Sequence, residues 1–310
     1  MSTIHAEGAG TAKAAPARST AHASLWRQSL RRLRKNKLAM LGLAVVAFMF
    51  LACFIGPLFS PYTDNKINMA FMNKAPSLKH WLGTDALGRD VLTRVLQAGR
   101  ISLTVGLASM VLSVFVGTLL GVIAGYYRGV ADQLIMRLAD LLLTIPSLPL
   151  LFIFGALLSE WKVPTDYRMY IVMLMLSIVG WPGLARMIRG QMLSLREREY
   201  MQATVVLGLR DRRKLFNHLL PNLVPLIIVI ATLNIGGAIL SESVLSYFGL
   251  GVMAPTPTWG NMIDAANNMI DFQDHPWLWI PPGFSIFATV IAINIFGDGL
   301  RDVLDPKQKR

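Results

Sequence analysis

Six long apolar runs without a single Asp, Glu, Lys or Arg dominate this sequence of 310 residues. Each run approaches or exceeds the roughly 17–25 residues that a helix needs to cross the hydrocarbon core of a bilayer. The runs occupy residues 38–59, 101–127, 141–159, 169–185, 222–241 and 276–297. The chain is therefore predicted to be an all-α polytopic membrane protein with six transmembrane helices.

The composition excludes an ordinary soluble globule. Charged residues make up 15% of the chain and hydrophobic residues 54%, whereas an average soluble domain has about 25% charged residues. A net charge of +12 also occurs in nucleic-acid-binding proteins, but here the basic residues cluster between the apolar runs, so membrane topology explains them better. We expect membrane lipid as a partner and no nucleic acid.

Basic residues are distributed unevenly on the two sides of the predicted spans. With the N-terminus inside, the inner segments contain 22 of the 30 Lys and Arg residues and the outer segments contain eight. Because Lys and Arg favour the cytoplasmic side, both termini are predicted to be cytoplasmic. The same alternation places residues 195–222 in the cytoplasm and residues 61–98 and 249–280 outside.

The N-terminal part divides into a tail and a membrane segment. Residues 1–24 lack apolar periodicity and predict a disordered cytoplasmic tail. Residues 25–60 join a basic interfacial segment, suited to an anionic leaflet, to the first apolar run. A signal peptide also begins with basic residues, but its apolar region is usually about 7–15 residues long, so we interpret this run as a retained helix.

Both outer segments contain residues typical of ordered structure. In residues 61–98, Thr84 or Asp85 is predicted to cap a short helix, with tight turns at two glycines. In residues 249–280, three tryptophans are placed as interfacial anchors would be, namely Trp259, Trp277 and Trp279. Whether these segments serve as lids and anchors or dock another protein directly stays open at this point.

Small residues recur every fourth position in the second run. They form one stripe along a helix and would let another backbone approach closely. The stripe predicts a tightly packed helix, at the centre of the bundle or at a subunit interface, although small residues are also common in membrane helices. Its members are Ser109, Ser113, Gly117, Gly121 and Gly125.

Ionisable residues are scarce inside the runs, which argues against an ion-coupled mechanism, because such proteins place charges at mid-membrane depth. Glu242 is the best remaining candidate, and we expect it to act as a cap or to face water at the outer end of its helix. No G-x-x-x-x-G-K-[ST], H-E-x-x-H or G-x-S-x-G motif is present, and Cys53 is the single cysteine. Catalytic residues, metal and cofactor are therefore predicted to be absent, and Asp264, Asp271 and Asp274 are interpreted as a solvated acidic loop.

The cytoplasmic loop 195–222 is the most polar segment inside the apolar part of the chain. An uncharged stretch, 200–207, is followed by Gly208, which tolerates positive φ and can end a helix. Asp211 is predicted to cap a second short helix through residue 216, and Pro221 to begin the fifth span. Helix, glycine and helix would form a rigid projection that transmits force from a soluble partner. A passive amphipathic loop is the alternative.

Four stretches of the chain resemble a known family. Gln202-Ala203-Thr204, Gly208 and Leu220-Pro221 fall at the spacing of the EAA loop of ABC importer permeases, with Gln202 in place of the glutamate and Thr204 in place of the second alanine. Residues 82–90 with 100–103, residues 245–260 and residues 297–306 are similar to dipeptide and oligopeptide permeases of the C-subunit type. The outer stretch contributes Gly83, Thr84, Asp85, Gly88, Arg89 and Asp90.

The resemblance covers about residues 25–310 and implies the type I importer permease fold. A five-helix core, residues 99–300, would follow the extra N-terminal helix, and residues 301–310 would form a cytoplasmic tail. Coupling to ATP hydrolysis would use Glu199, Gln202, Ala203, Gly208, Arg210, Asp211, Arg212, Arg213, Leu220 and Pro221.

The implied partners are two ATP-hydrolysing cytoplasmic subunits, a paralogous permease subunit, an extracytoplasmic solute-binding protein and a peptide substrate. The implied location is the bacterial cytoplasmic (inner) membrane. Import of another small solute, such as a nickel chelate or glutathione, remains an alternative, as does an ion-coupled transporter or channel. A membrane-bound enzyme is disfavoured by the missing catalytic motifs.

Overall fold

A computed structural model describes residues 31–63 and 66–304 of the chain. Every named element among these residues is helical, and they contain no strand beyond one isolated bridge between Thr84 and Asp90. The long helices are α2 (Lys37–Phe59), α3 (Val91–Tyr127), α4 (Gly129–Thr144), α5 (Ser147–Glu160), α6 (Thr165–Arg196), α9 (Leu220–Tyr247) and α12 (Ile280–Leu304). The predicted disordered tail 1–24 and the last six residues lie outside the described ranges.

Short elements connect the long helices. The α-helical ones are α7 (Glu199–Val206), α8 (Asp211–Arg213), α10 (Trp259–Ile263) and α11 (Met269–Asp274). A π-helical turn covers Lys214–Leu219, and 3-10 turns cover Met69–Phe71, Asp264–Asn267 and Pro276–Leu278.

Five of the described helices are long and apolar enough to cross a membrane, and the number rises to six if α4 and α5 together count as one broken span. The expectation of one continuous helix over residues 141–159 is wrong, because α4 and α5 meet at 87°. The break falls at Ile145 and Pro146. Ile145 is extended (φ −87°, ψ 126°), which is the conformation that a following proline favours.

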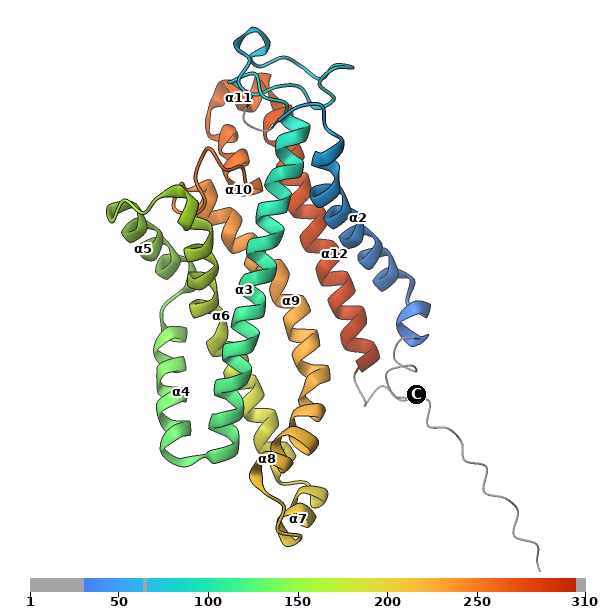
Figure 1. The fold of residues 1–310 in the computed structure, drawn as a ribbon, viewed down its shortest axis with the longest axis vertical. Coiled ribbons are helices and arrows are strands. Elements are labelled where there is room, and N and C mark those ends of the chain that lie inside the picture. Colours follow the sequence, from blue (N-terminus) through green and yellow to red (C-terminus); the bar gives the residue numbers. More distant parts are fainter. Residues whose placement is uncertain (1–30, 64–65, 305–310) are drawn as a thin grey trace, which may run out of the picture.

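The long helices lie side by side, and the short elements gather at the two ends of the bundle (Figure 1). Residues 66–90, α10 and α11 lie at one end, called here the α10–α11 end. The opposite end, formed by α7, α8 and the turn between α3 and α4, is the α7–α8 end. The helix α2 begins and α12 ends toward the α7–α8 end.

The small-residue stripe of α3 packs against α6. All five stripe residues are buried. A Cβ atom added to Gly121 would lie 2.6 Å from the carbonyl oxygen of Ala185, so only glycine permits this approach of the two backbones. Ser177 on α6 also donates a hydrogen bond from Oγ to the carbonyl oxygen of Ser109 (3.2 Å). The neighbour of the stripe is thus another helix of the same chain.

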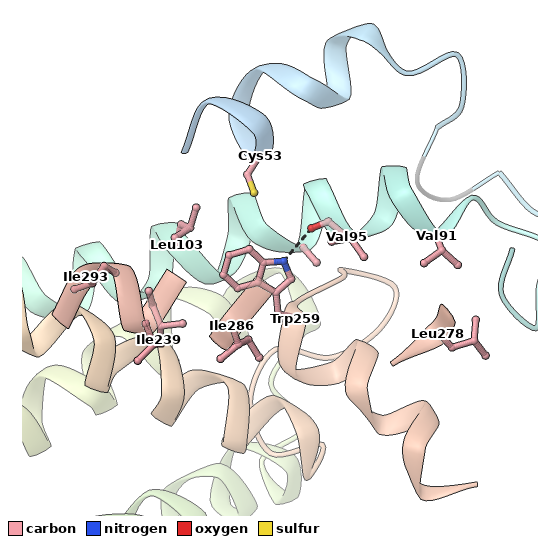
Figure 2. Packing of buried hydrophobic residues seen from close by; sticks show 11 residues of the cluster. Cys53, Val91, Val95, Leu103, Ile239, Trp259, Leu278, Ile286 and Ile293 are labelled. Carbon is pink, nitrogen blue, oxygen red and sulfur yellow. Dashed lines mark hydrogen bonds between the residues drawn. The ribbon is translucent and has the colours of Figure 1, made fainter. Parts of the chain in front are cut away.

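A second core lies around Trp259, near the α10–α11 end (Figure 2). The indole is fully buried, and its Nε1 donates to the carbonyl oxygen of Val95 (3.0 Å). The prediction that Trp259 is an interfacial anchor is therefore wrong. The cause is tertiary: α10 folds back against α9, α12 and α3, and so carries the indole into the bundle.

Candidate functional sites at the two ends

The α7–α8 end projects a short helix that finishes at a glycine. The helix α7 is closed by two hydrogen bonds, from Leu209 N to the Thr204 carbonyl (3.1 Å) and from Gly208 N to the Val205 carbonyl (2.9 Å). This is the Schellman pattern, which requires a left-handed residue after the helix. Gly208 supplies it with φ +66°, as its position in the sequence predicts.

The predicted role of Asp211 as a helix cap is wrong. Asp211 is the first residue of α8, and its carboxylate accepts hydrogen bonds from the Tyr126 hydroxyl (2.6 Å) and Lys214 Nζ (3.3 Å). The helix also does not stop near residue 216, but widens into the π turn and continues into α9. Pro221 explains the widening, since it has no N–H to donate to the preceding turn.

Tyr126, at the last turn of α3, connects the projection to the bundle. Besides its bond to Asp211, its carbonyl oxygen accepts a hydrogen bond from Arg196 Nη1, and the Arg196 Cζ lies 5.3 Å from the Tyr126 ring centroid. Arg128 and Glu197 form a further ion pair (3.3 Å) across the same end. These contacts join α8 to the ends of α3 and α6.

The C-terminal end of α7 exposes a row of apolar residues. Val205, Val206 and Leu207 are 61%, 87% and 76% exposed, whereas Met201 and Thr204 face inward. A cleft of about 590 Å³ lies between α7, α8 and the end of α3, and both Gln202 and Asp211 line it.

The structure distributes the predicted coupling residues over this end. Glu199, Gln202 and Ala203 lie on α7, and Leu220 and Pro221 in the first turn of α9. Most of the set is solvent-exposed, namely Glu199, Gln202, Ala203, Gly208, Arg210, Asp211, Arg212, Arg213 and Pro221.

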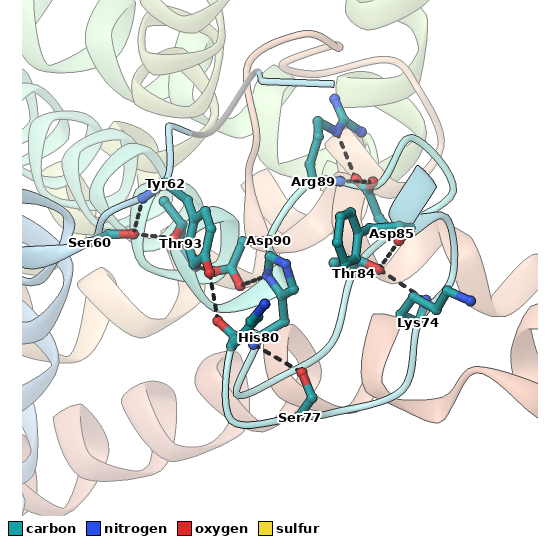
Figure 3. A network of polar contacts seen from close by, with 12 residues as sticks. Ser60, Tyr62, Lys74, Ser77, His80, Thr84, Asp85, Arg89, Asp90 and Thr93 are labelled. Atoms are coloured by element: carbon teal, nitrogen blue, oxygen red, sulfur yellow. Dashed lines mark hydrogen bonds and ion pairs between the residues drawn. The ribbon is translucent and has the colours of Figure 1, made fainter. Parts of the chain in front are cut away.

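At the α10–α11 end, Asp85 organises the predicted 82–90 signature into a closed turn (Figure 3). Its carboxylate accepts hydrogen bonds from Leu87 N (2.9 Å), Arg89 N (2.9 Å) and Arg89 Nε (2.7 Å). Gly83 and Gly88 have φ +72° and +69°, which confirms the tight turns expected there.

The residue that caps a helix in this segment is Asp90, not Thr84 or Asp85. The Asp90 carboxylate accepts from Thr93 N (2.8 Å) at the start of α3 and contacts His80 Nδ1 (2.9 Å) (Figure 3). The helix that follows is the long α3 rather than a short one. Thr93 Oγ1 lies 2.6 Å from Ser60 Oγ, so the turn is also bonded to the end of α2. No spacing in the sequence indicates that Ser60, His80 and Thr93 meet.

Glu242 does not face water, contrary to our expectation. The residue is 0% exposed, and its carboxylate accepts hydrogen bonds from Ser102 Oγ (2.8 Å) and Ser246 Oγ (2.7 Å). The loop before α10 covers it. Ser102 lies 140 positions away in the sequence, so this pairing follows only from the packing of α3 on α9.

The acidic residues of the segment 249–280 make local contacts. Asp271 contacts His275 Nδ1 (2.8 Å), and Asp264 accepts from Asn267 Nδ2 (2.7 Å). Within residues 31–63 and 66–304, no group of three His, Cys, Asp or Glu side chains is placed to hold a metal ion. Trp277, one of the expected anchors, donates from Nε1 to the carbonyl of Thr84 (3.2 Å).

The long apolar helices define a polytopic helical membrane protein. Its α7–α8 end projects from the bundle and exposes apolar residues. Comparison with known proteins identifies the family of this chain. Residues 117–310 match the family described as binding-protein-dependent transport system inner membrane component, and residues 24–76 match the N-terminal transmembrane domain of oligopeptide transport permease C. The chain belongs to this family of inner-membrane transport permeases.

Relatives match over nearly the whole chain. The oligopeptide transport system permease protein OppC of Bacillus subtilis is 39% identical over 288 residues, 93% of this chain and 91% of the relative. A putative peptide permease protein of Brucella suis is 40% identical over 280 residues, 90% of each chain. The dipeptide transport system permease protein DppC of Alkalihalophilus pseudofirmus is 39% identical and covers 92% of this chain and 91% of the relative.

Proposed function

We propose that this chain is a permease subunit of an ATP-binding-cassette importer for dipeptides or oligopeptides. The relatives that match it over nine-tenths of its length bear peptide-permease names. The single observation that carries the coupling role is the exposed α7–α8 projection, whose apolar residues have no covering within the described chain. A rigid exposed helix of this kind suits docking in a groove of a soluble subunit.

The α7–α8 end faces the cytoplasm in this proposal. Its loop contains eight of the chain's Lys and Arg residues between positions 186 and 221, which fits the cytoplasmic side. Because α2 begins and α12 ends toward the same end, both termini are then cytoplasmic too. Residues 61–90 and 249–279 face outward, where a solute-binding protein delivers cargo.

The chain supplies half of a translocation pathway, and a paralogous permease supplies the other half. Two ATPase subunits close on binding ATP and move the α7–α8 projections with them. The ion pairs and the Tyr126 contacts pass this movement to α3 and α6. The pathway then opens alternately to the two sides of the membrane. A peptide backbone needs a polar, hydrated route, since unsatisfied amide groups are costly in hydrocarbon. Nickel chelates or glutathione are the alternative cargo, and the bound ligand of the binding protein distinguishes them.

Charge reversal tests the coupling role. Arg212 and Arg213 are both exposed and make no ion pair among the described residues. Arg212→Glu with Arg213→Glu should leave membrane insertion and thermal stability unchanged, yet reduce ATP-driven peptide uptake by about tenfold or more, as expected when interface charges oppose each other.

The matched control is Arg137→Glu, a reversal on α4 outside the loop.

The wild-type complex should contain two ATPase subunits and a second permease. Undiminished uptake by the double variant, or transport by this chain alone under an ion gradient, would contradict the proposal.

A further inference from the structure

Glu242 occupies a fully buried position on α9, close to the outer end of that helix. Its two carboxylate oxygens are held by different hydroxyls, Oε2 by Ser102 of α3 and Oε1 by Ser246 of α9. A carboxyl group removed from water requires such bonds, because its burial is otherwise strongly unfavourable. Among the described residues, the hydrogen-bond partners of this carboxylate are hydroxyl groups and not Lys or Arg.

Each of the two serines also binds one end of the loop 252–259. Ser246 Oγ accepts a hydrogen bond from Val252 N (3.1 Å), and Ser102 Oγ accepts one from Trp259 N (3.2 Å). A hydroxyl has a single proton, so it can donate to the carboxylate while its lone pairs accept from the backbone. Glu242 therefore orients both hydroxyls and, through them, both ends of the loop. We call Glu242, Ser102 and Ser246 the Glu242 latch.

The loop held by the latch forms a wall of an outer cleft. This cleft has a volume of about 600 Å³ and lies at the α10–α11 end. Val252, Met253 and Ala254 of the loop line it together with Asp85 and Arg89 of the 82–90 turn. A change in the position of the loop would therefore change the width of the cleft.

We propose that Glu242 is a positioning residue whose latch holds loop 252–259 in place and so sets the shape of the outer face that receives the solute-binding protein. The second half of this statement rests on the proposed importer function. The first half concerns only the position of the loop and can be tested without transport.

The position of the loop is measured with two spin labels across the cleft. Ala86→Cys and Ala254→Cys are both exposed and line the cleft, and Cys53→Ala removes the native thiol. Pulsed electron paramagnetic resonance on the full chain in lipid nanodiscs reports their distance distribution. In Glu242→Gln the amide nitrogen cannot accept from a serine hydroxyl, so one serine must turn its proton elsewhere. This reorientation weakens its bond to the loop N–H, and the distribution should broaden.

A matched control is available in the next residue. Ser243 Oγ lies 3.5 Å from the same carboxylate but accepts no loop N–H in the described structure, so Ser243→Ala should leave the distribution unchanged. Ser246→Ala and Ser102→Ala should each broaden the distance distribution. If Glu242→Gln does not insert into the membrane, these two variants test the latch in its place. An unchanged distribution in the latch variants, or equal broadening in Ser243→Ala, would overturn the latch.

A kinetic measurement on the reconstituted transporter tests the functional half. In Glu242→Gln, the concentration of binding protein that half-saturates ATPase stimulation should rise about fivefold, the equivalent of one lost hydrogen bond. The maximal stimulated rate should change much less. Broadened distances with an unchanged half-saturating concentration would reject the role in receiving the binding protein and retain the latch. If no binding protein stimulates even the wild type, the importer function itself fails, and the distance measurement still decides the latch.

Discussion

The two ends of the bundle differ in which kinds of side chain they bury and which they expose. At the α10–α11 end Glu242, Thr258 and Trp259 are all 0% exposed, although two of them are polar. At the α7–α8 end Val206 and Leu207 are 87% and 76% exposed, although both are apolar. The α10–α11 end buries these polar groups in a network of its own, although α11 also exposes Met269 and Ile270 (69% and 62%). The α7–α8 end has its exposed apolar residues on a projection from the bundle.

This difference shows where buried polar groups already have partners within the chain. Buried polar groups are stable when hydrogen-bonded, and the α10–α11 end supplies those bonds from α3, α9 and α10. Exposed apolar side chains in a row mark a surface that another protein covers. In the proposed function, the α7–α8 end is the surface that an ATPase subunit covers, whereas the Glu242 network holds its part of the α10–α11 end without a partner. Three predictions test this comparison, in order of decreasing effect.

The largest effect is expected where the α10–α11 end is closely packed. A Cβ atom on Gly260 would lie 2.3 Å from the carbonyl oxygen and 2.6 Å from the Cα of Ser243, both of them backbone atoms. Gly260→Ala should therefore lower the free energy of unfolding by about 3 kcal/mol. Denaturation in nanodiscs measures this change. Gly237→Ala on α9 is the control, because nothing lies within 4 Å of its added Cβ. A comparable loss of unfolding free energy in the control would show that close packing at Gly260 is not the cause.

An intermediate effect, on binding rather than folding, is expected at the α7–α8 end. Val206→Glu places a charge on an exposed apolar surface, so stability should change by less than about 0.5 kcal/mol. The free energy of binding to the ATPase subunits should become less favourable by about 2 kcal/mol, the size expected for a central contact. Co-purification and binding titration measure it. Val130→Glu, at a residue 71% exposed near the start of α4, is the matched control. Equal loss in both variants would mean that the surface is not specific to α7.

The smallest effect is expected at Gly208, where only the backbone is constrained. Its φ of +66° is unfavourable for alanine by about 1–2 kcal/mol, while no atom lies within 4 Å of an added Cβ. Gly208→Ala should therefore accelerate amide hydrogen exchange at Leu209, which closes the helix. Gly208→Asn should have a smaller effect, because asparagine tolerates the left-handed region. If both variants exchange like the wild type, the Schellman closure is not what holds the end of α7.

Several features of this structure were predictable because they depend on neighbouring residues alone. Every charge-free run except 141–159 lies wholly or largely in a continuous long helix. The glycines at 83, 88 and 208 predicted turns, since a single residue determines its own accessible φ. Some wrong predictions have local causes: the span 141–159 breaks before Pro146, and the helix is capped by Asp90 rather than by Thr84 or Asp85. Others concern longer-range contacts. Glu242 was assigned to the surface because it directly follows an apolar run, and Trp259 because tryptophans between spans are typical of the membrane interface. Asp211 was assigned a local capping role, whereas its actual partner, Tyr126, is 85 positions away.

The sequence by itself determined that the chain is helical, membrane-spanning and related to transport permeases, because length, hydropathy and motif spacing are read along the chain. Only the tertiary structure decided which side chains are covered. Whether Glu242 meets water or two serines depends on how α10 and its preceding loop fold back onto α3. That packing brings together residues whose contact cannot be predicted from their separation in the sequence.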